Sequence, residues 1–265
     1  MTTPKFLMCA PDYYKVAYEI NPWMSVERKV DHAKALKQWT AYYELLTKKL
    51  KVSVELLEPA KDLPDLVFTA NGGLVKKRMF IRSNFRFPQR QKEEPVYEKW
   101  FKKNGYIVKK IERPHCFEGE GDALFMGEEL FTGYHFRSDV EAHDEVSGIL
   151  KAPYFALELC DKRFYHLDTC FAPLNDKSAL VFLKAFEPYA QMALLESIQD
   201  PIEVPENEAL RFACNAVVLG QEIVIPSDCP ETTQQLEKRK FRVFDLDFSE
   251  FIKAGGAAKC LVLRI

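Results

Sequence analysis

The sequence predicts one α/β domain, residues 1–265, built as a cyclic array of five ββαβ modules. Helix centres recur roughly every 50 residues, and short β-like runs with turn signals lie between them. A doubly wound sheet usually carries a Gly-rich turn after its first strand, and this chain has none. No linker rich in Pro, Ser or Gly interrupts the chain, so we expect a single domain.

Five helices are expected in order along the chain. Their approximate ranges are 26–51, 91–103, 138–150, 188–198 and 230–239. The first range carries apolar residues at helical spacing from Val30 to Leu46. The third begins with Ser138 and Glu141, which form the pattern of a capping box.

Strand-like runs rich in β-branched and aromatic residues separate these helices. The runs are 6–9, 52–57, 106–111, 123–125, 179–182, 216–219, 223–225 and 241–244. The array closes into a ring only if the last segment, 261–265, returns beside the first strand.

Composition restricts the classes of function. The formal net charge is −2, with 47% hydrophobic and 29% charged residues, as in a soluble globular protein. No basic stripe is present, which argues against nucleic acid as the main partner because phosphate contacts need clustered Lys and Arg. No run approaches the roughly 18 apolar residues of a membrane helix, and the N-terminus lacks a signal-peptide pattern. We therefore expect a cytoplasmic protein with a small-molecule substrate and no membrane contact; a homo-oligomer stays open.

Seven cysteines are scattered along the chain, and no two have the two-residue spacing of a zinc or redox site. We expect no metal site, and most of the thiols should be buried in a reducing compartment. Cys260 differs from the others in its setting. It follows Gly255 and Gly256, which permit close backbone approach, so it is either a reactive thiol or a buried cysteine of the last strand.

Two polar segments elsewhere in the chain carry groups that would complement this cysteine in an active site. His166 and Asp168 lie in a strand-like run, and alternation would place them on the same face, although a buried histidine with a satisfied hydrogen bond fits as well. The segment 117–122 interleaves three carboxylates with two glycines. Its charge excludes a phosphate cradle, and its spacing does not fit a helix-loop-helix calcium site. Carboxylates match the fork of a guanidinium, while a solvated acidic turn is the alternative.

Three further segments offer binding groups. The run 65–71 reads as a strand ending in a glycine turn, where Asn71 is a polar ligand or only a turn residue. Asn21 lies in a loop before the first helix. Arg82, Arg86 and Arg90 form a spaced basic set that suits a carboxylate or is simply exposed.

Together these segments resemble the guanidino-group-modifying enzymes of the pentein superfamily, in the branch of dimethylarginine dimethylaminohydrolase-like and arginine-hydrolysing proteins. The matching motifs occur in the family's order over nearly the whole chain: 21–24, 65–71, 117–122, 166–168 and 255–260. The resemblance implies a five-bladed α/β propeller with its site in the central channel, which agrees with the five modules counted above.

The resemblance also implies a role for each candidate residue. Cys260 would be the nucleophile, and His166 the general acid/base. Glu118, counted with this catalytic group, would grip the guanidinium together with Asp168. The remaining substrate-binding residues would be Asp65, Asn71, Asn21 and Arg90, the last two at the amino-acid end.

In the mechanism that the family implies, Cys260 attacks the guanidinium carbon, and His166 protonates the departing amine to leave a covalent thiouronium. Water activated by the same histidine then releases a ureido product. No metal or organic cofactor is required.

Asn71 departs from many relatives, which carry an acid there. A neutral amide should favour a ureido group, so the favoured activity is an arginine dihydrolase that continues to ornithine, ammonia and carbon dioxide. The alternatives are a dimethylarginine dimethylaminohydrolase or an arginine deiminase giving citrulline. An amidinotransferase, with an amine in place of water, or a non-catalytic propeller also remains open.

Overall fold

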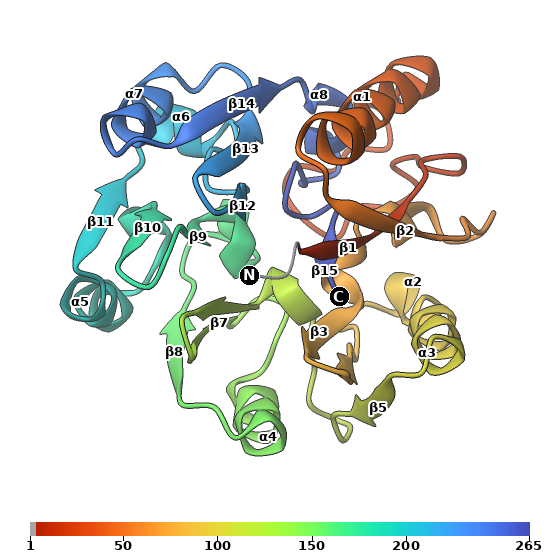
Figure 1. Ribbon diagram of the computed structural model, residues 1–265. Helices are drawn as coiled ribbons and strands as arrows, with labels where there is room; N and C mark the ends of the chain where they lie inside the picture. The colour runs from red at the N-terminus through yellow and green to blue at the C-terminus, as the bar shows by residue number, and fades with distance from the viewer. Residues whose placement is uncertain (1–3) are drawn as a thin grey trace.

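A computed structural model describes residues 4–265 and contains five three-stranded sheets arranged around a central axis, with the helices outside them (Figure 1). Each sheet combines one antiparallel and one parallel strand pair. In sheet order the strands are β15 (Leu263–Arg264), β1 (Lys5–Cys9) and β2 (Ser53–Leu57); β3 (Gly73–Lys76), β4 (Met79–Arg82) and β5 (Ile107–Lys110); β6 (Ala123–Met126), β7 (Glu129–Tyr134) and β8 (Tyr154–Glu158); β9 (Phe171–Pro173), β10 (Ser178–Val181) and β11 (Asp200–Glu203); and β12 (Val217–Leu219), β13 (Glu222–Pro226) and β14 (Arg242–Leu246).

The helices connect the second and third strands of each sheet or the sheets themselves. They are α1 (His32–Glu44), α2 (Pro88–Gln91), α3 (Glu94–Lys103), α4 (Val140–Leu150), α5 (Pro188–Ser197), α6 (Glu206–Ala209), α7 (Pro230–Lys238) and α8 (Ser249–Ile252). A π-helical segment, Leu45–Lys49, continues α1. Each sheet with its helix is therefore one ββαβ module. Within residues 4–265, no helix is long and apolar enough to span a membrane.

The two ends of the chain close the ring. β15 pairs antiparallel with β1, Phe6 opposite Arg264 and Leu7 opposite Leu263, so the fifth module is assembled from both termini. β1 and the C-terminus lie near the centre of the ring in Figure 1. The predicted five-bladed α/β propeller, including the return of the last segment beside the first strand, is confirmed.

Several helix boundaries differ from the predictions, and the second predicted helix, 91–103, begins as α3 at Glu94. The first helix begins at His32 and not at 26, because the Asp31 side chain accepts a hydrogen bond from the Lys34 amide and caps it there. The predicted capping box of Ser138 is wrong. That hydroxyl donates to Asp122 at 2.6 Å, and α4 begins two residues later at Val140.

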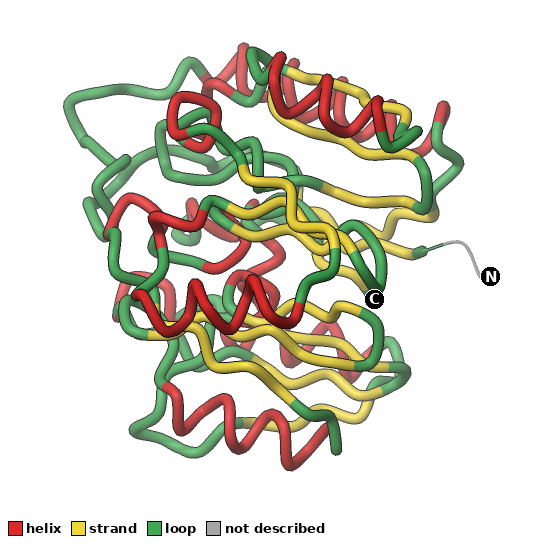
Figure 2. The backbone as a smooth tube through the Cα atoms, turned by 90° about the vertical axis from the view of Figure 1, so that its left-hand side faces the viewer, coloured by secondary structure: helices red, strands yellow, loops and turns green. Residues whose placement is uncertain are grey.

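Short 3₁₀ turns replace the strands predicted around the candidate residues. Pro64–Val67, Thr69–Gly72 and Leu167–Thr169 are all 3₁₀ segments, and Cys260 lies in a turn before β15. The alternation argument for His166 and Asp168 was therefore wrong. Each of the last three segments leads directly into the first strand of a blade: β3, β9 and β15. Figure 2 shows this loop-rich end of the ring, which lies away from the C-terminus.

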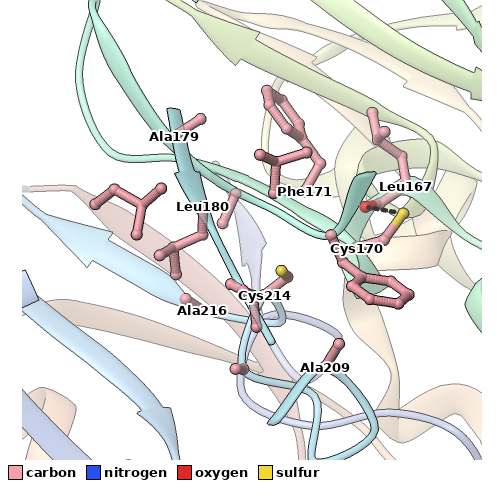
Figure 3. Close-up of a cluster of buried hydrophobic side chains, with 14 of the residues drawn as sticks. Leu167, Cys170, Phe171, Ala179, Leu180, Ala209, Cys214 and Ala216 are labelled. Carbon is pink, nitrogen blue, oxygen red and sulfur yellow. Dashed lines mark hydrogen bonds between the residues drawn. The ribbon is translucent and has the colours of Figure 1, made fainter. Parts of the chain in front are cut away.

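The hydrophobic core packs against the turn that carries Asp168. In the cluster of Figure 3, Leu167, Cys170 and Phe171 pack with residues of β10 and of the segment before β12. The Cys170 thiol donates to the Leu167 carbonyl at 3.5 Å, and burial raises its pKa well above the ordinary value. Five of the seven cysteines are buried, as predicted, and Cys170 is a packing residue. The turn that carries Asp168 is thus anchored in the core.

Candidate active site

Five equivalent chain segments, one from each blade, converge at one end of the ring. Each contributes a polar residue two to five positions before the first strand of its blade. These residues are Asn71 before β3, Glu118 before β6, Asp168 before β9, Asn215 before β12 and Cys260 before β15. All five are buried. The ring thus brings together residues that are up to 189 positions apart, the interval from 71 to 260.

A small cavity lies at this convergence. Its lining residues are Ile20, Asn21, Met24, Asp65, Phe68, Asn71, Arg90, Arg137, Tyr165, Ala254 and Cys260. Five predicted site residues are in this set. The three others, His166, Glu118 and Asp168, lie directly behind it and contact the lining side chains.

The Cys260 sulfur has two polar neighbours. Sγ lies 3.2 Å from Asp168 Oδ2 and 3.1 Å from Asn215 Nδ2. Burial and the Asp168 carboxylate raise the pKa of the thiol well above its ordinary value. The Cys260 side chain is consequently a neutral thiol that donates to Asp168.

Burial also raises the pKa of Asp168, to about 7, although Lys259 opposes the increase. Near neutral pH this carboxyl is therefore close to the midpoint of its titration. A cation entering the cavity would favour the ionised form, because an opposite charge within a few ångströms stabilises it.

His166 contacts the Glu118 carboxylate, which in turn pairs with the Arg137 guanidinium. Nε2 of His166 lies 2.8 Å from Glu118 Oε2, and the same oxygen accepts from Arg137 Nη1 at 2.9 Å. Burial opposes ionisation of Glu118, but Arg137 and the histidine keep its pKa well below the ordinary value. Burial lowers the pKa of His166 to about 4, although Glu118 opposes this, so the ring is neutral. Glu118 fixes the tautomer with Nε2 protonated and leaves Nδ1 as a base.

Arg90 organises the other wall of the cavity. Its guanidinium donates to Glu93 through Nε and Nη2, to Asn71 Oδ1 at 2.8 Å, and to the Asp65 carbonyl at 3.2 Å. Burial raises the pKa of Asp65, whose Oδ2 accepts from the Tyr18 hydroxyl. Most of the Arg90 donors are thus used within the protein.

Four buried polar atoms around the cavity have no hydrogen-bond partner. They are Asp65 Oδ1, Asn71 Nδ2, His166 Nδ1 and Asp168 Oδ1, four of the seven such side-chain atoms in the described chain. A buried polar atom without a partner costs about 1–3 kcal/mol, so such a concentration marks groups reserved for a ligand. Two of the atoms accept hydrogen bonds, one is a base, and one donates.

Asn71 and His166 approach each other across Gly121. A Cβ on Gly121 would lie 2.4 Å from Asn71 Nδ2 and 3.2 Å from His166 Nδ1. Only glycine leaves room for both unpartnered nitrogens on the same side of the site.

Asn21 closes the cavity from the N-terminal loop. Its Oδ1 accepts from the amides of Trp23 and Met24, and its Nδ2 donates to the Ala254 carbonyl at 3.0 Å. The side chain lines the cavity, but only one N–H remains for a ligand.

Glu118 does not line the cavity, and its Oε2 contacts both His166 and Arg137, so in this structure it supports the histidine. Arg82 pairs with Glu94 and Glu98, and Arg86 pairs with Asp139, away from the cavity lining.

Sequence reasoning missed Arg137 and Asn215, and it gave Asp122 no role of its own within the segment 117–122. Asp122 accepts from the Ser138 hydroxyl and from the Leu167 amide at 3.1 Å, so it joins two blades. Asn215 was detectable, because it precedes its strand by the same two positions as Asn71. Arg137 lies in a connection between β7 and α4 and had no such signal.

The residues described here do not include a group of three or more His, Cys, Asp and Glu side chains arranged to hold a metal ion. A second cavity, of about 330 Å³, is lined by the ion pair of Lys259 and Glu120 among other residues, and by none of the eight predicted site residues. The predicted site residues thus gather at the smaller cavity beside Cys260.

Comparison with known proteins places this geometry in a family. The family model described as N,N dimethylarginine dimethylhydrolase, eukaryotic, matches residues 17–265. The chain is 42% identical to the bifunctional arginine dihydrolase/ornithine cyclodeaminase AgrE of Nostoc sp., over 98% of this chain and 38% of that protein. It is 39% identical to the N(G),N(G)-dimethylarginine dimethylaminohydrolase of Mycobacterium tuberculosis, over 99% of this chain and 86% of that protein.

The solved structures agree with the sequence matches. The N-terminal domain of ArgZ, an arginine dihydrolase, was solved as a cysteine-to-serine mutant bound to substrate. It superposes with a TM-score of 0.94 at 40% identity, covering 98% of this chain and 97% of that one. A variant of that domain with one asparagine replaced by serine was captured covalently bound to a reaction intermediate. The chain spans well under half the length of AgrE and ArgZ themselves. It belongs to the family of N,N-dimethylarginine dimethylhydrolases.

Proposed function

We propose that this protein hydrolyses the guanidino group of arginine through a covalent bond to Cys260 and releases ornithine, ammonia and carbon dioxide. The set of unpartnered atoms carries the proposal. Asp65 Oδ1 and Asp168 Oδ1 can accept guanidinium N–H groups, and His166 Nδ1 can move protons. Asn71 Nδ2 supplies the donor that a ureido oxygen needs.

The first half of the reaction forms the thiouronium. The Cys260 sulfur bonds to the guanidinium carbon, and its proton passes to Nδ1 of neutral His166. The bond from that carbon to a terminal nitrogen then breaks, and His166 gives the proton to the departing ammonia. Hydrogen bonds to Asp168 orient the carbon toward Sγ, since both groups lie within 3.2 Å of each other.

The second half uses water. His166 removes a proton from the water that attacks the same carbon, the carbon–sulfur bond breaks, and the thiol is regenerated with citrulline in the site. A second cycle on the ureido carbon with another water yields ornithine. Together, arginine and two waters give ornithine, two ammonia and one carbon dioxide.

Asn71 determines whether the reaction stops at citrulline or continues to ornithine. Its Oδ1 accepts from Arg90, which leaves Nδ2 as the group facing the ligand. A donor there suits a neutral carbonyl and opposes a cation. An aspartate at this position would pair with Arg90 and present only acceptors, which favours a guanidinium and the release of citrulline.

The relatives support this choice. AgrE and ArgZ, whose names include arginine dihydrolase, match nearly all of this chain, and the substrate-bound ArgZ domain has almost the same length. We accordingly propose residues 1–265 as a single catalytic domain. The seven unpaired cysteines support a reducing, cytoplasmic setting.

A second candidate activity is hydrolysis of dimethylarginine. The Mycobacterium tuberculosis relative with that name matches 99% of this chain. The two aspartates would accept from the nitrogens that lack methyl groups, and dimethylamine would leave in place of ammonia.

The test is incubation with arginine carrying ¹³C at the guanidino carbon, followed by mass analysis of products. The proposal expects unlabelled ornithine and ¹³C-labelled carbon dioxide, with Asn71→Asp stopping at labelled citrulline. A parallel reaction with dimethylarginine reports the second candidate. Cys260→Ser controls for contaminating hydrolases, and Cys160→Ser, which alters an exposed cysteine, should behave like the wild type.

A further inference from the structure

Asn215 is the fifth polar residue at the convergence of the blades and is fully buried. Its side-chain Oδ1 accepts from the amides of Ala257 at 3.1 Å and Cys260 at 3.2 Å. Its backbone carbonyl accepts from the Lys259 amide at 3.2 Å. Three amides of the segment that carries the nucleophile are therefore attached to this one residue.

The nitrogen of the same amide group points at the reacting atoms. Asn215 Nδ2 donates to Cys260 Sγ at 3.1 Å and to the Asp168 backbone carbonyl at 3.0 Å. Both N–H groups and both lone pairs of the amide are thus used, which is the full capacity of an asparagine side chain. The reverse orientation would set the amide nitrogen against two backbone N–H donors, so the network fixes the donor toward sulfur.

This donor matters most when the sulfur is charged. The neutral thiol can donate to Asp168, but a thiolate would face that carboxylate at 3.2 Å with both groups negative. Among the contacts of the described chain, the Asn215 amide is the side-chain donor to Sγ. A hydrogen bond to a charged acceptor is stronger than one to a neutral acceptor, so this contact strengthens as the proton leaves.

We propose that Asn215 stabilises the Cys260 thiolate during attack and again when the sulfur leaves the carbon. It does so as a pre-positioned donor whose orientation is fixed by the nucleophile segment itself. The role in turnover rests on the proposed function, whereas the effect on thiol reactivity does not depend on which substrate the protein takes.

Asn215→Asp is the informative variant. The carboxylate has the shape of the amide and can still accept from Ala257 and Cys260, but it cannot donate to sulfur when ionised. Loss of a hydrogen bond to a charged group corresponds to about a 10- to 100-fold change. We expect the rate of Cys260 alkylation by iodoacetamide at pH 7 to fall by that factor, and its pH profile to move to higher pH. Iodoacetamide is neutral, so the added charge does not change its attraction to the site.

Asn84→Asp is the matched control. Asn84 is also buried and bonds backbone carbonyls through Nδ2, but it does not contact Cys260. Peptide mass mapping separates labelling of Cys260 from that of the other thiols. If Asn215→Asp does not fold, Asn215→Ser provides the same comparison, with thermal unfolding measured for both variants.

An unchanged alkylation rate and pH profile in a folded Asn215 variant would overturn the proposal and leave Asn215 as a structural residue. If Asn84→Asp slowed alkylation and shifted the pH profile as Asn215→Asp does, this would also overturn the proposal, because the effect would then be general. Turnover of arginine, with a fall in kcat and little change in KM, tests the catalytic consequence separately. An inactive wild type would refute the proposed function without touching the alkylation result.

Discussion

Breaking the buried ion pair of Glu118 and Arg137 should lower the free energy of unfolding far more than breaking any surface ion pair of this protein. Its side chains are 0% and 3% exposed, and Nη1 lies 2.9 Å from Oε2. Glu118→Gln leaves the Arg137 charge buried without its anion. Arg137→Met leaves the Glu118 charge with neutral partners, the His166 ring and the Arg86 amide.

Removing one partner of a buried ion pair costs about 3–5 kcal/mol, because the remaining charge stays desolvated and unpaired. Each single variant should lower the free energy of unfolding by about that amount. The double variant should lose much less than the sum, since it leaves neither charge. Glu118→Gln should also reduce kcat by about 10²-fold or more, because His166 loses the anion that fixes its tautomer.

Urea unfolding followed by the fluorescence of the three tryptophans gives the four free energies of the cycle. The control cycle is Asp200 with Arg239, a pair at 2.7 Å whose side chains are 43% and 30% exposed. A surface pair of this kind contributes about 0–1 kcal/mol. A coupling energy for Glu118 and Arg137 no larger than that of the control pair would refute the reasoning.

Three further results are expected. A haloacetamidine should label Cys260 before the other six thiols and abolish activity; label on another cysteine with loss of activity would contradict its role as the nucleophile. The kcat/KM should rise as pH increases through about 7, because burial raises the pKa of Asp168 to about that value and the ionised form grips the cation. Replacing Lys259 by Met together with Glu120 by Gln should move this rise to higher pH, since Lys259 opposes the increase in pKa; an unmoved profile would exclude Asp168 as the titrating group. Gly121→Ala should lower activity by displacing the two nitrogens beside it, whereas Gly148→Ala in α4, where a Cβ meets nothing within 4 Å, should leave activity unchanged; equal activities would show that the space beside Gly121 is not needed.

Much of the fold could be predicted because it follows from local periodicity. The helices at 188–198 and 230–239 agree with the structure to within one residue, and the ring closes at the predicted segment. The error at the first helix has a local cause, because Asp31 caps the helix five residues after the predicted start at residue 26.

The turns could not be predicted by the same reasoning. The segments 65–71 and 166–168 contain residues that favour strands, but the chain forms 3₁₀ turns there. The Phe68 amide bonds the Asp65 carbonyl, and the Asn71 amide bonds the Phe68 carbonyl. Strand alternation therefore predicted correctly that His166 and Asp168 lie at one site, although the segment is not a strand. His166 and Asp168 reach the same site because Glu118 and Cys260 come to them from other blades.

The candidate residues were found through the resemblance, and seven of the eight are buried beside one cavity. Their partners were harder to find. Arg137 holds Glu118 through a contact 19 residues apart, and Asn215 reaches Cys260 across 45 residues. Such contacts depend on the closed ring, which no local pattern encodes.

The central claim is that arginine is carried past citrulline at a single site, and one measurement tests it most directly. Arginine labelled with ¹³C at the guanidino carbon is incubated with the wild-type protein, and labelled carbon dioxide and ornithine are quantified over time. The account predicts that the two appear in equal amounts, with two ammonia for each, and that Asn71→Asp accumulates labelled citrulline instead. Arginine converted only to citrulline by the wild type, or left untouched while dimethylarginine releases dimethylamine, would contradict it.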